Sequence, residues 1–310
     1  MSIRGCWACA VIIDGKLKPS CTTAVRDGKN IHTVEYEVAK HAPLRLVSGF
    51  QGHSVGGVGT PYWIKPKGLN YRYIEVACFA HGCVLRCPTC QNWEITYSSV
   101  EKPLTPNQAA RIMTREGRVH GVDRMAISGG ECTLNRCWPI EYLRELRRLN
   151  TDEEARFHVD TNAVILTRDY IDDLVHAGMT DIGPDVKGLD VGTFVRISGL
   201  KDEELAKKLL ETEWNAVKYL LDQYLGEIFI GIGVPYNSKL ISLDELRRIG
   251  ERIADMETNV QVCVLDYRPE FRRQDITRPT FDEMVQVKNV LEDTGLKCVI
   301  CQTEQGHIGP

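Results

Sequence analysis

The sequence has no long apolar run and no large excess of charge of either sign. Its 310 residues carry a formal net charge of −4, which gives no electrostatic reason to expect a nucleic-acid partner. No apolar stretch approaches the roughly 20 residues of a transmembrane helix, and residues 1–6 lack the apolar region of a secretory signal. Long internal repeats and low-complexity tracts are also absent. We therefore expect a cytoplasmic protein with no membrane partner.

Cysteine, in contrast, is abundant. Twelve cysteines are unusual for a protein of the reducing cytoplasm unless many of them bind metal. Paired disulfides in a secreted protein are the alternative, but the missing export signal counts against them. The cysteines fall into groups along the chain: Cys6, Cys9 and Cys21; Cys78, Cys83, Cys87 and Cys90; Cys132 and Cys137; Cys263, Cys298 and Cys301. This content and grouping indicate a metalloprotein.

Three of these cysteines lie in one short loop, which reads Cys83-Val-Leu-Arg-Cys87-Pro-Thr-Cys90. A [4Fe-4S] cluster has four irons and takes four ligands. Three cysteines in so short a segment can hold three irons and leave the fourth open to a substrate or cofactor. The same triplet also suits a zinc site, so spacing alone leaves both metals open.

From about residue 73 onward, strand-like and helix-like segments alternate. Strands are predicted at 73–79, 124–127, 157–160, 181–186, 227–234, 260–265 and 297–300, with helices from 105 and over 139–149, 168–177, 203–224, 242–256 and 280–295. Such β-then-α units imply a parallel sheet with right-handed crossovers, either open and doubly wound or a full or partial barrel. The first 70 residues lack this alternation and contain glycine-rich linking material at 52–59. We expect an N-terminal cysteine-containing extension over 1–70 and a main domain over 71–310.

Four polar or glycine-rich segments lie at or just past the ends of predicted strands. They are the cysteine loop and residues 128–131, 160–162 and 185–187. Ligand sites in parallel sheets and barrels lie at the carboxyl ends of the strands, so we expect these segments to share one rim. Simpler roles are open for three of them: a plain glycine turn at 129–130, a helix cap at Asn162, and a rim salt bridge between Asp185 and Lys187.

The cysteine triplet, followed by Ser128-Gly129-Gly130-Glu131, resembles the radical S-adenosylmethionine (SAM) superfamily. Residues 90–95, 185–190, 231–237 and 267–269 narrow the resemblance to relatives of the pyruvate formate-lyase activating enzymes, especially the AmmeMemoRadiSam-type proteins. The resemblance covers about residues 44–305. It implies an α/β fold, namely a partial (β/α)6-type TIM barrel with the cluster at its top.

The resemblance also implies roles for individual residues. Cys83, Cys87 and Cys90 would hold a [4Fe-4S] cluster, and the amino and carboxylate groups of SAM would bind its fourth iron. Candidate cofactor-binding residues are Ser128, Gly129, Gly130, Glu131, Asp160 and Asn162, and the candidate catalytic pair is Asp185 and Lys187. One electron, from a donor such as ferredoxin or flavodoxin, would cleave SAM to methionine and a 5′-deoxyadenosyl radical.

That radical would abstract hydrogen from a protein, a peptide or a small molecule. A glycine of a partner protein is one candidate, by likeness to the activating enzymes. The alternatives are a non-catalytic iron–sulfur electron-transfer protein and a radical SAM enzyme that modifies RNA; the acidic net charge disfavours the latter.

Residues 5–9 and 16–25 resemble part of the ferredoxin-like [2Fe-2S] motif of complex I and formate dehydrogenase large subunits. That motif needs one more cysteine upstream of Cys6, which this sequence does not supply. An auxiliary iron–sulfur cluster is therefore expected at Cys6, Cys9 and Cys21, completed by Cys78, Cys298 or Cys301 if the extension folds back over the barrel. Structural zinc and unligated thiols are the alternatives.

Overall fold

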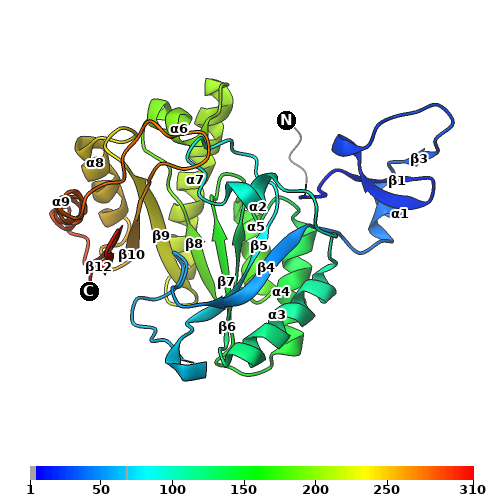
Figure 1. Ribbon diagram of the computed structural model, residues 1–310, viewed down its shortest axis with the longest axis horizontal. Helices are drawn as coiled ribbons and strands as arrows, with labels where there is room; N and C mark the ends of the chain where they lie inside the picture. Colours follow the sequence, from blue (N-terminus) through cyan, green and yellow to red (C-terminus); the bar gives the residue numbers. More distant parts are fainter. Residues whose placement is uncertain (1–4, 68) are drawn as a thin grey trace.

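Mostly parallel strands form the sheet at the centre of the molecule (Figure 1). The structure, a computed structural model, describes residues 5–67 and 69–310. In this part of the chain the sheet has nine strands in the order β12-β11-β10-β9-β8-β7-β6-β5-β4. The parallel strands are β5 (Glu75–Ala80), β6 (Arg124–Gly129), β7 (Arg156–Thr161), β8 (Asp181–Pro184), β9 (Phe229–Tyr236), β10 (Gln261–Asp266) and β11 (Cys298–Thr303).

Antiparallel strands form both edges of the sheet. β4 (Val47–His53) pairs with β5, and β12 (Gly306–Ile308) pairs with β11. Within the described ranges β4 and β12 do not pair with each other, so the barrel is not closed. The predicted partial barrel of (β/α)6 type is thereby confirmed.

Helices connect successive parallel strands and cover the outside of the sheet (Figure 1). They are α2 (Trp93–Tyr97) and α3 (Pro106–His120) after β5, α4 (Cys137–Leu149) after β6, α5 (Arg168–His176) after β7, α6 (Val191–Ser198) and α7 (Glu203–Tyr224) after β8, α8 (Leu243–Ala254) after β9, and α9 (Phe281–Glu292) after β10. Because each connection returns the chain to the same end of the sheet, every loop after a parallel strand opens on one rim.

Local sequence explains where several helices begin. Thr105 caps α3 in a capping box with Gln108, and Pro106 occupies the first turn; Thr280 and Glu283 form a second box at α9. Ser242 and Glu245 have the spacing of a capping box, but only half of it forms, since Ser242 accepts from the backbone of Glu245 while the Glu245 carboxylate accepts from Thr193 of α6.

Residues 54–61 enter the barrel from the end opposite the rim, and we call them the plug. Gly59 donates its backbone N–H to Oδ1 of Asp160 at 3.4 Å, and the carbonyl of Val58 accepts from the Gln261 side chain at 3.2 Å. A Cβ atom built on Gly231 would lie 2.2 Å from the Val58 carbonyl oxygen. The glycine-rich segment predicted as a linker therefore fills the interior of the barrel.

The N-terminal residues form a small antiparallel sheet beside the barrel (Figure 1). It contains β1 (Ala10–Ile13), β2 (Lys16–Pro19) and β3 (Ile31–His32) in the order β2-β1-β3, with the 3-10 turn η1 (Ser20–Thr22) and the short helix α1 (Glu35–Ala39); a second 3-10 turn, η2 (Leu69–Tyr71), precedes β5. Part of the predicted 1–70 extension, namely β4 and the plug, belongs to the barrel.

Among the described helices we find none with the length and apolarity needed to cross a bilayer.

Candidate active site

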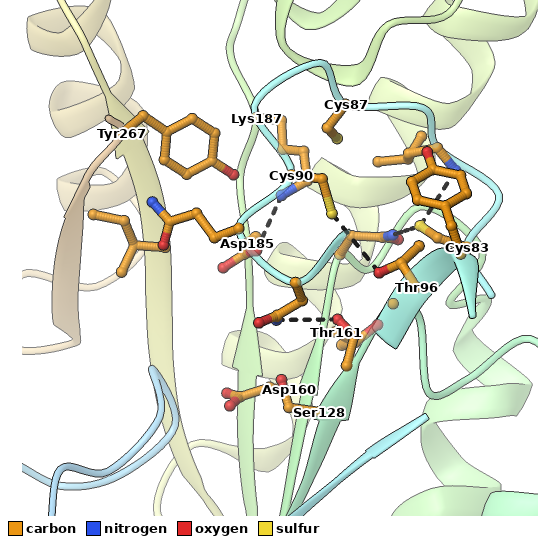
Figure 2. Close-up of a pocket in the computed structure, with 18 residues that line it drawn as sticks. Cys83, Cys87, Cys90, Thr96, Ser128, Asp160, Thr161, Asp185, Lys187 and Tyr267 are labelled. Atoms are coloured by element: carbon orange, nitrogen blue, oxygen red, sulfur yellow. Dashed lines mark hydrogen bonds and ion pairs between the residues drawn. The ribbon is translucent and has the colours of Figure 1, made fainter. Parts of the chain in front are cut away.

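A pocket lies at the rim formed by the carboxyl ends of the parallel strands (Figure 2). The four segments predicted to share this rim all contribute to it. Of the residues predicted to hold the cluster, to bind SAM or to act in catalysis, all except Glu131 line the pocket: Cys83, Cys87, Cys90, Ser128, Gly129, Gly130, Asp160, Asn162, Asp185 and Lys187. The topology of the sheet thus brings together residues that span 105 positions of the chain, from 83 to 187.

The three thiols of the cysteine loop face this pocket, and none forms a disulfide. Cys83 Sγ accepts hydrogen bonds from the backbone N–H of Leu85 at 3.3 Å and from Nδ2 of Asn162 at 3.5 Å. Cys90 Sγ lies 3.7 Å from Oγ1 of Thr96 (Figure 2). Backbone and side-chain hydrogen bonds therefore hold two of the three sulfurs.

The thiols suit a cluster that takes one cysteine per iron. Burial raises the pKa of Cys87 to about 11 and holds the pKa of Cys83 well above its ordinary value, so the thiols release their protons only when a metal replaces them. No three His, Cys, Asp or Glu side chains in the described ranges are close enough together to hold one ion, whereas a [4Fe-4S] cluster spreads its ligands over separate irons. The donor set fits a cluster with three cysteine ligands.

The glycines of the 128–131 turn are required by close packing. A Cβ on Gly129, whose φ is +118°, would lie 2.4 Å from the backbone nitrogen of Ala80, and one on Gly130 would lie 2.3 Å from the carbonyl oxygen of Gly82. The N–H of Gly130 donates to Ala80 and that of Glu131 to Gly82, both at 2.8 Å. The turn is therefore pressed against the start of the cysteine loop, which fixes the two walls of the pocket relative to each other.

Glu131 lies beneath the pocket and does not line it. Its side chain is buried, and its two oxygens accept from the Thr133 backbone N–H and hydroxyl, from the Thr161 hydroxyl and from the Asn162 backbone N–H, at 2.7–3.0 Å. Glu131 thus connects the turns after β6 and β7 through hydrogen bonds, and its direct contact with a cofactor stays a prediction. The fully buried Arg45 braces the same turn, since its guanidinium donates to the carbonyls of Glu131 and Cys132.

Asp185 and Lys187 form the side wall after β8. Lys187 Nζ lies 3.0 Å from Oδ2 of Asp185, and the backbone N–H of Lys187 donates to Oε1 of the buried Glu213 at 2.6 Å. Burial alone would lower the pKa of Lys187, but the Asp185 carboxylate outweighs it and holds that pKa well above the ordinary value. The ammonium therefore stays charged although its side chain is only 5% exposed.

Further lining residues come from segments whose sequence carries no strong local signal. Gln91, Asn92, Thr96 and Tyr97 of and before α2, and Leu265 and Tyr267 at the end of β10, complete the pocket. The loop after β10 also packs on the cysteine loop, because Arg272 donates its backbone N–H to the Pro88 carbonyl at 3.0 Å and Phe271 stacks on Trp93. Of these segments, only residues 267–269 are indicated by the sequence, through the family resemblance.

The cysteines predicted for an auxiliary cluster do not come together. Cys298 and Cys301 pair with Gln261 and Val264 in the register of β10 and β11, and their odd spacing puts their side chains on opposite faces of the strand. The small N-terminal sheet lies at the far side of the barrel from β11 and β12 (Figure 1). The expectation that Cys298 or Cys301 completes an N-terminal site is therefore wrong for this structure.

The N-terminal cysteines themselves are only partly grouped. The backbone N–H of Cys21 donates to Cys9 Sγ at 3.4 Å. Burial raises the pKa of Cys9, but hydrogen bonds from Cys21 and Ser20 outweigh it and leave the pKa lowered. Cys6 is buried, and its carbonyl accepts from the Asn135 side chain at 3.1 Å. A cluster at Cys6, Cys9 and Cys21 stays a prediction.

Comparison of the sequence with known proteins matches residues 78–222 to the family model described as the radical SAM superfamily. The PqqA peptide cyclase of Bradyrhizobium diazoefficiens is 28% identical over 134 residues, and that of Rhodopseudomonas palustris is 30% identical over 135 residues. Each match covers 43% of this chain and 33% of the relative. This chain thus matches about a third of the length of these peptide cyclases.

Solved structures of other proteins share the fold of this chain. Streptococcus suis SuiB bound to S-adenosylmethionine superposes with a TM-score of 0.52 at 16% identity, over 68% of this chain and 44% of SuiB. SuiB bound to the precursor peptide SuiA gives a TM-score of 0.51 at 16% identity, over 68% of this chain and 43% of SuiB. The matched segment contains the cysteine triplet, the 128–131 turn and the Asp185–Lys187 wall. Residues 78–222 of this chain therefore belong to the radical SAM superfamily.

Proposed function

We propose that this chain is a radical SAM enzyme that holds a [4Fe-4S] cluster through Cys83, Cys87 and Cys90 and acts on a peptide. When bound, the cluster and SAM together supply reductive cleavage of the sulfonium and hydrogen abstraction from the substrate. The observation that carries the proposal is the convergence of three free thiols with residues 128–130, 160–162 and 185–187 on one pocket.

The residues of the chain would bind and orient the reactants. The three cysteines would hold three irons, and the described lining offers no fourth cysteine, which suits a fourth iron reserved for SAM. Asp160 and Asn162, at the carboxyl end of β7, are polar groups suited to the hydroxyl and amino groups of SAM. The charged Asp185–Lys187 pair is placed to orient polar groups of SAM or substrate at the opposite wall.

A peptide is the substrate class that we favour. The support is that two curated relatives, 28% and 30% identical over the matched residues, are named PqqA peptide cyclases, and that a solved structure with the same fold contains a precursor peptide. A glycine of a partner protein stays a more specific prediction.

We further propose a ferredoxin or flavodoxin as electron donor and the cytoplasm as location. The fully non-catalytic electron-transfer alternative gives no role to the close-packed glycine turn at 128–131 beside the thiols.

Anaerobic reconstitution of the full chain tests the proposal. We expect about four irons per chain for one cluster and formation of 5′-deoxyadenosine when SAM and a reductant are added. Cys87→Ala should abolish this product and lower bound iron, whereas Cys137→Ala, a change of an exposed free cysteine on α4, should leave both unchanged. Product formation by Cys87→Ala, or wild-type protein that binds iron but never yields 5′-deoxyadenosine, would overturn the proposal.

A further inference from the structure

Lys187 is a buried charge placed beside the cysteine loop. It follows β8 and lines the same pocket as the three thiols, and Figure 2 shows its ammonium directed toward Asp185. Only 5% of its side chain is exposed. A lysine in such a position needs a counter-charge, because an isolated buried ammonium is strongly unfavourable.

Asp185 is the charged partner that faces the pocket. Its Oδ2 atom lies 3.0 Å from Lys187 Nζ. Glu213 lies behind the lysine, where burial raises its pKa well above the ordinary value, and its Oε2 atom has no hydrogen-bond partner. Glu213 thus holds the backbone of Lys187, while Asp185 holds its ammonium.

The same ammonium acts electrostatically on two of the cysteines. Lys187 lines the same pocket as Cys87 and Cys90, and its positive charge opposes the rise in pKa that burial causes at both thiols. Cys83, in contrast, has its sulfur held by the Leu85 N–H and the Asn162 amide. The three sulfurs therefore meet different surroundings: neutral donors at Cys83, a nearby cation at Cys87, and both the Thr96 hydroxyl and the cation at Cys90.

We propose that Lys187 is a positioning and tuning residue that raises the reduction potential of a cluster held by Cys83, Cys87 and Cys90, with Asp185 acting in the opposite direction. The inference rests on the proposed function, since it requires that the cluster be present. Reduction adds one negative charge to a site of three thiolates, and net charge, hydrogen bonds to the sulfurs and solvent exposure set the potentials of such clusters. A fixed cation that water cannot screen favours the reduced state.

Redox titration of the reconstituted chain without SAM tests this inference. The ratio of reduced to oxidised cluster is measured by electron paramagnetic resonance at fixed solution potentials, after iron and sulfide analysis of each variant. Lys187→Met, which keeps the length of the side chain but not its charge, should lower the ratio at least tenfold, equivalent to about 59 mV for a one-electron couple. Asp185→Asn should raise the ratio, and Lys187→Arg should retain most of the wild-type value.

Lys218→Met is the matched control, because Lys218 lies exposed on α7 and pairs only with Asp222 in the described structure; it should leave the ratio unchanged. Opposite shifts for Lys187→Met and Asp185→Asn support an electrostatic effect, since simple damage to the site would move both in one direction. Equal ratios in wild type and Lys187→Met, at equal iron content, overturn the inference. Failure of the wild type to bind a cluster overturns the proposed function instead, so the two failures are distinct.

Discussion

The Nε2 atom of His158 lies 2.8 Å from Oδ1 of Asp160, where the barrel interior meets the floor of the pocket. On its other side, Nδ1 of His158 lies 3.5 Å from Oε2 of Glu75 on β5. The imidazole is fully buried. It therefore links two carboxylates and fixes Asp160, one of the candidate SAM-binding residues, from below.

This arrangement predicts an alkaline loss of stability. Burial lowers the pKa of His158, but Asp160 and Glu75 outweigh it and raise the pKa to about 10. Since an unfolded histidine titrates near 6.5, the folded state binds the extra proton, and its stabilisation is complete below about pH 6.5 and lost as pH rises through about 10. The free energy of unfolding, measured by urea denaturation, should fall over this window by a few kcal/mol more in wild type than in His158→Gln.

His176→Gln is the control, because His176 is exposed at the end of α5. It should keep the wild-type slope of stability against pH. The assignment is contradicted if His158→Gln retains that slope, because the proton would then bind elsewhere.

A second prediction concerns Gly59 in the plug. A Cβ at this position would lie 2.5 Å from His158 Nε2 and 2.7 Å from the backbone nitrogen of Gly183. Neither neighbour can move freely, since one is buried and the other belongs to β8. Gly59→Ala should reduce the free energy of unfolding by roughly 1–3 kcal/mol, as in overpacked cores.

Gly192→Ala provides the comparison in the same chain. A Cβ atom built on Gly192 would have the Arg196 side chain as its nearest neighbour, at 3.7 Å. Gly192 also lies in α6, and alanine is favoured over glycine in helices by about 1 kcal/mol. Thermal denaturation should therefore show a neutral or stabilising effect. A Gly59→Ala protein as stable as the Gly192→Ala protein would mean that the plug is not packed as described.

The barrel was predictable because periodicity dominates its strands and amphipathic helices. α7 begins and ends at the predicted residues, and the site segments converged because all follow parallel strands. β4 and α6 were missed, since neither forms on local preference. β4 contains two glycines and depends on pairing with β5. The Glu245 carboxylate accepts from Leu189, Asp190 and Thr193, which stabilises the start of α6 from a distant helix.

The residues of the site also divide into those that the local sequence predicts and those that depend on the fold. The thiols and the Asp185–Lys187 pair are chemically distinctive, so their spacing identifies them. Tyr97 and Leu265 are ordinary core-type residues that line the pocket only because of where α2 and β10 end. The bracing role of Glu131 depends on contacts with Thr161 and Asn162, about 30 residues away, and no local pattern encodes such contacts.

A third prediction separates the cysteines by function. Cys298→Ala with Cys301→Ala should leave the iron content of the reconstituted chain unchanged, because these side chains lie on opposite faces of β11. Loss of the buried Cys301 sulfur should lower stability by about 1 kcal/mol. Cys83→Ala, measured in parallel, should lower bound iron. If the double variant lost iron, Cys298 or Cys301 would bind metal and the prediction would be wrong.

A fourth prediction tests whether Glu131 braces the pocket. In Glu131→Gln one carboxylate oxygen becomes an NH₂ group, which would meet either the Asn162 N–H or the donors of Thr133 and Thr161. At least one buried hydrogen bond is then lost, and the free energy of unfolding should fall by about 1–3 kcal/mol. Urea denaturation of the protein without iron measures this loss apart from any effect on a bound cofactor.

Glu304→Gln, in the exposed turn before β12, is the matched control and should be neutral. Because Glu131 holds the backbone of Asn162 and Asn162 donates to Cys83 Sγ, Glu131→Gln should also weaken iron retention during gel filtration. If the only role of Glu131 were direct contact with SAM, Glu131→Gln would show the reverse pattern: stability and iron retention would be unchanged, and SAM binding would be lost. Measuring all three quantities on the same preparation therefore decides between bracing and direct contact.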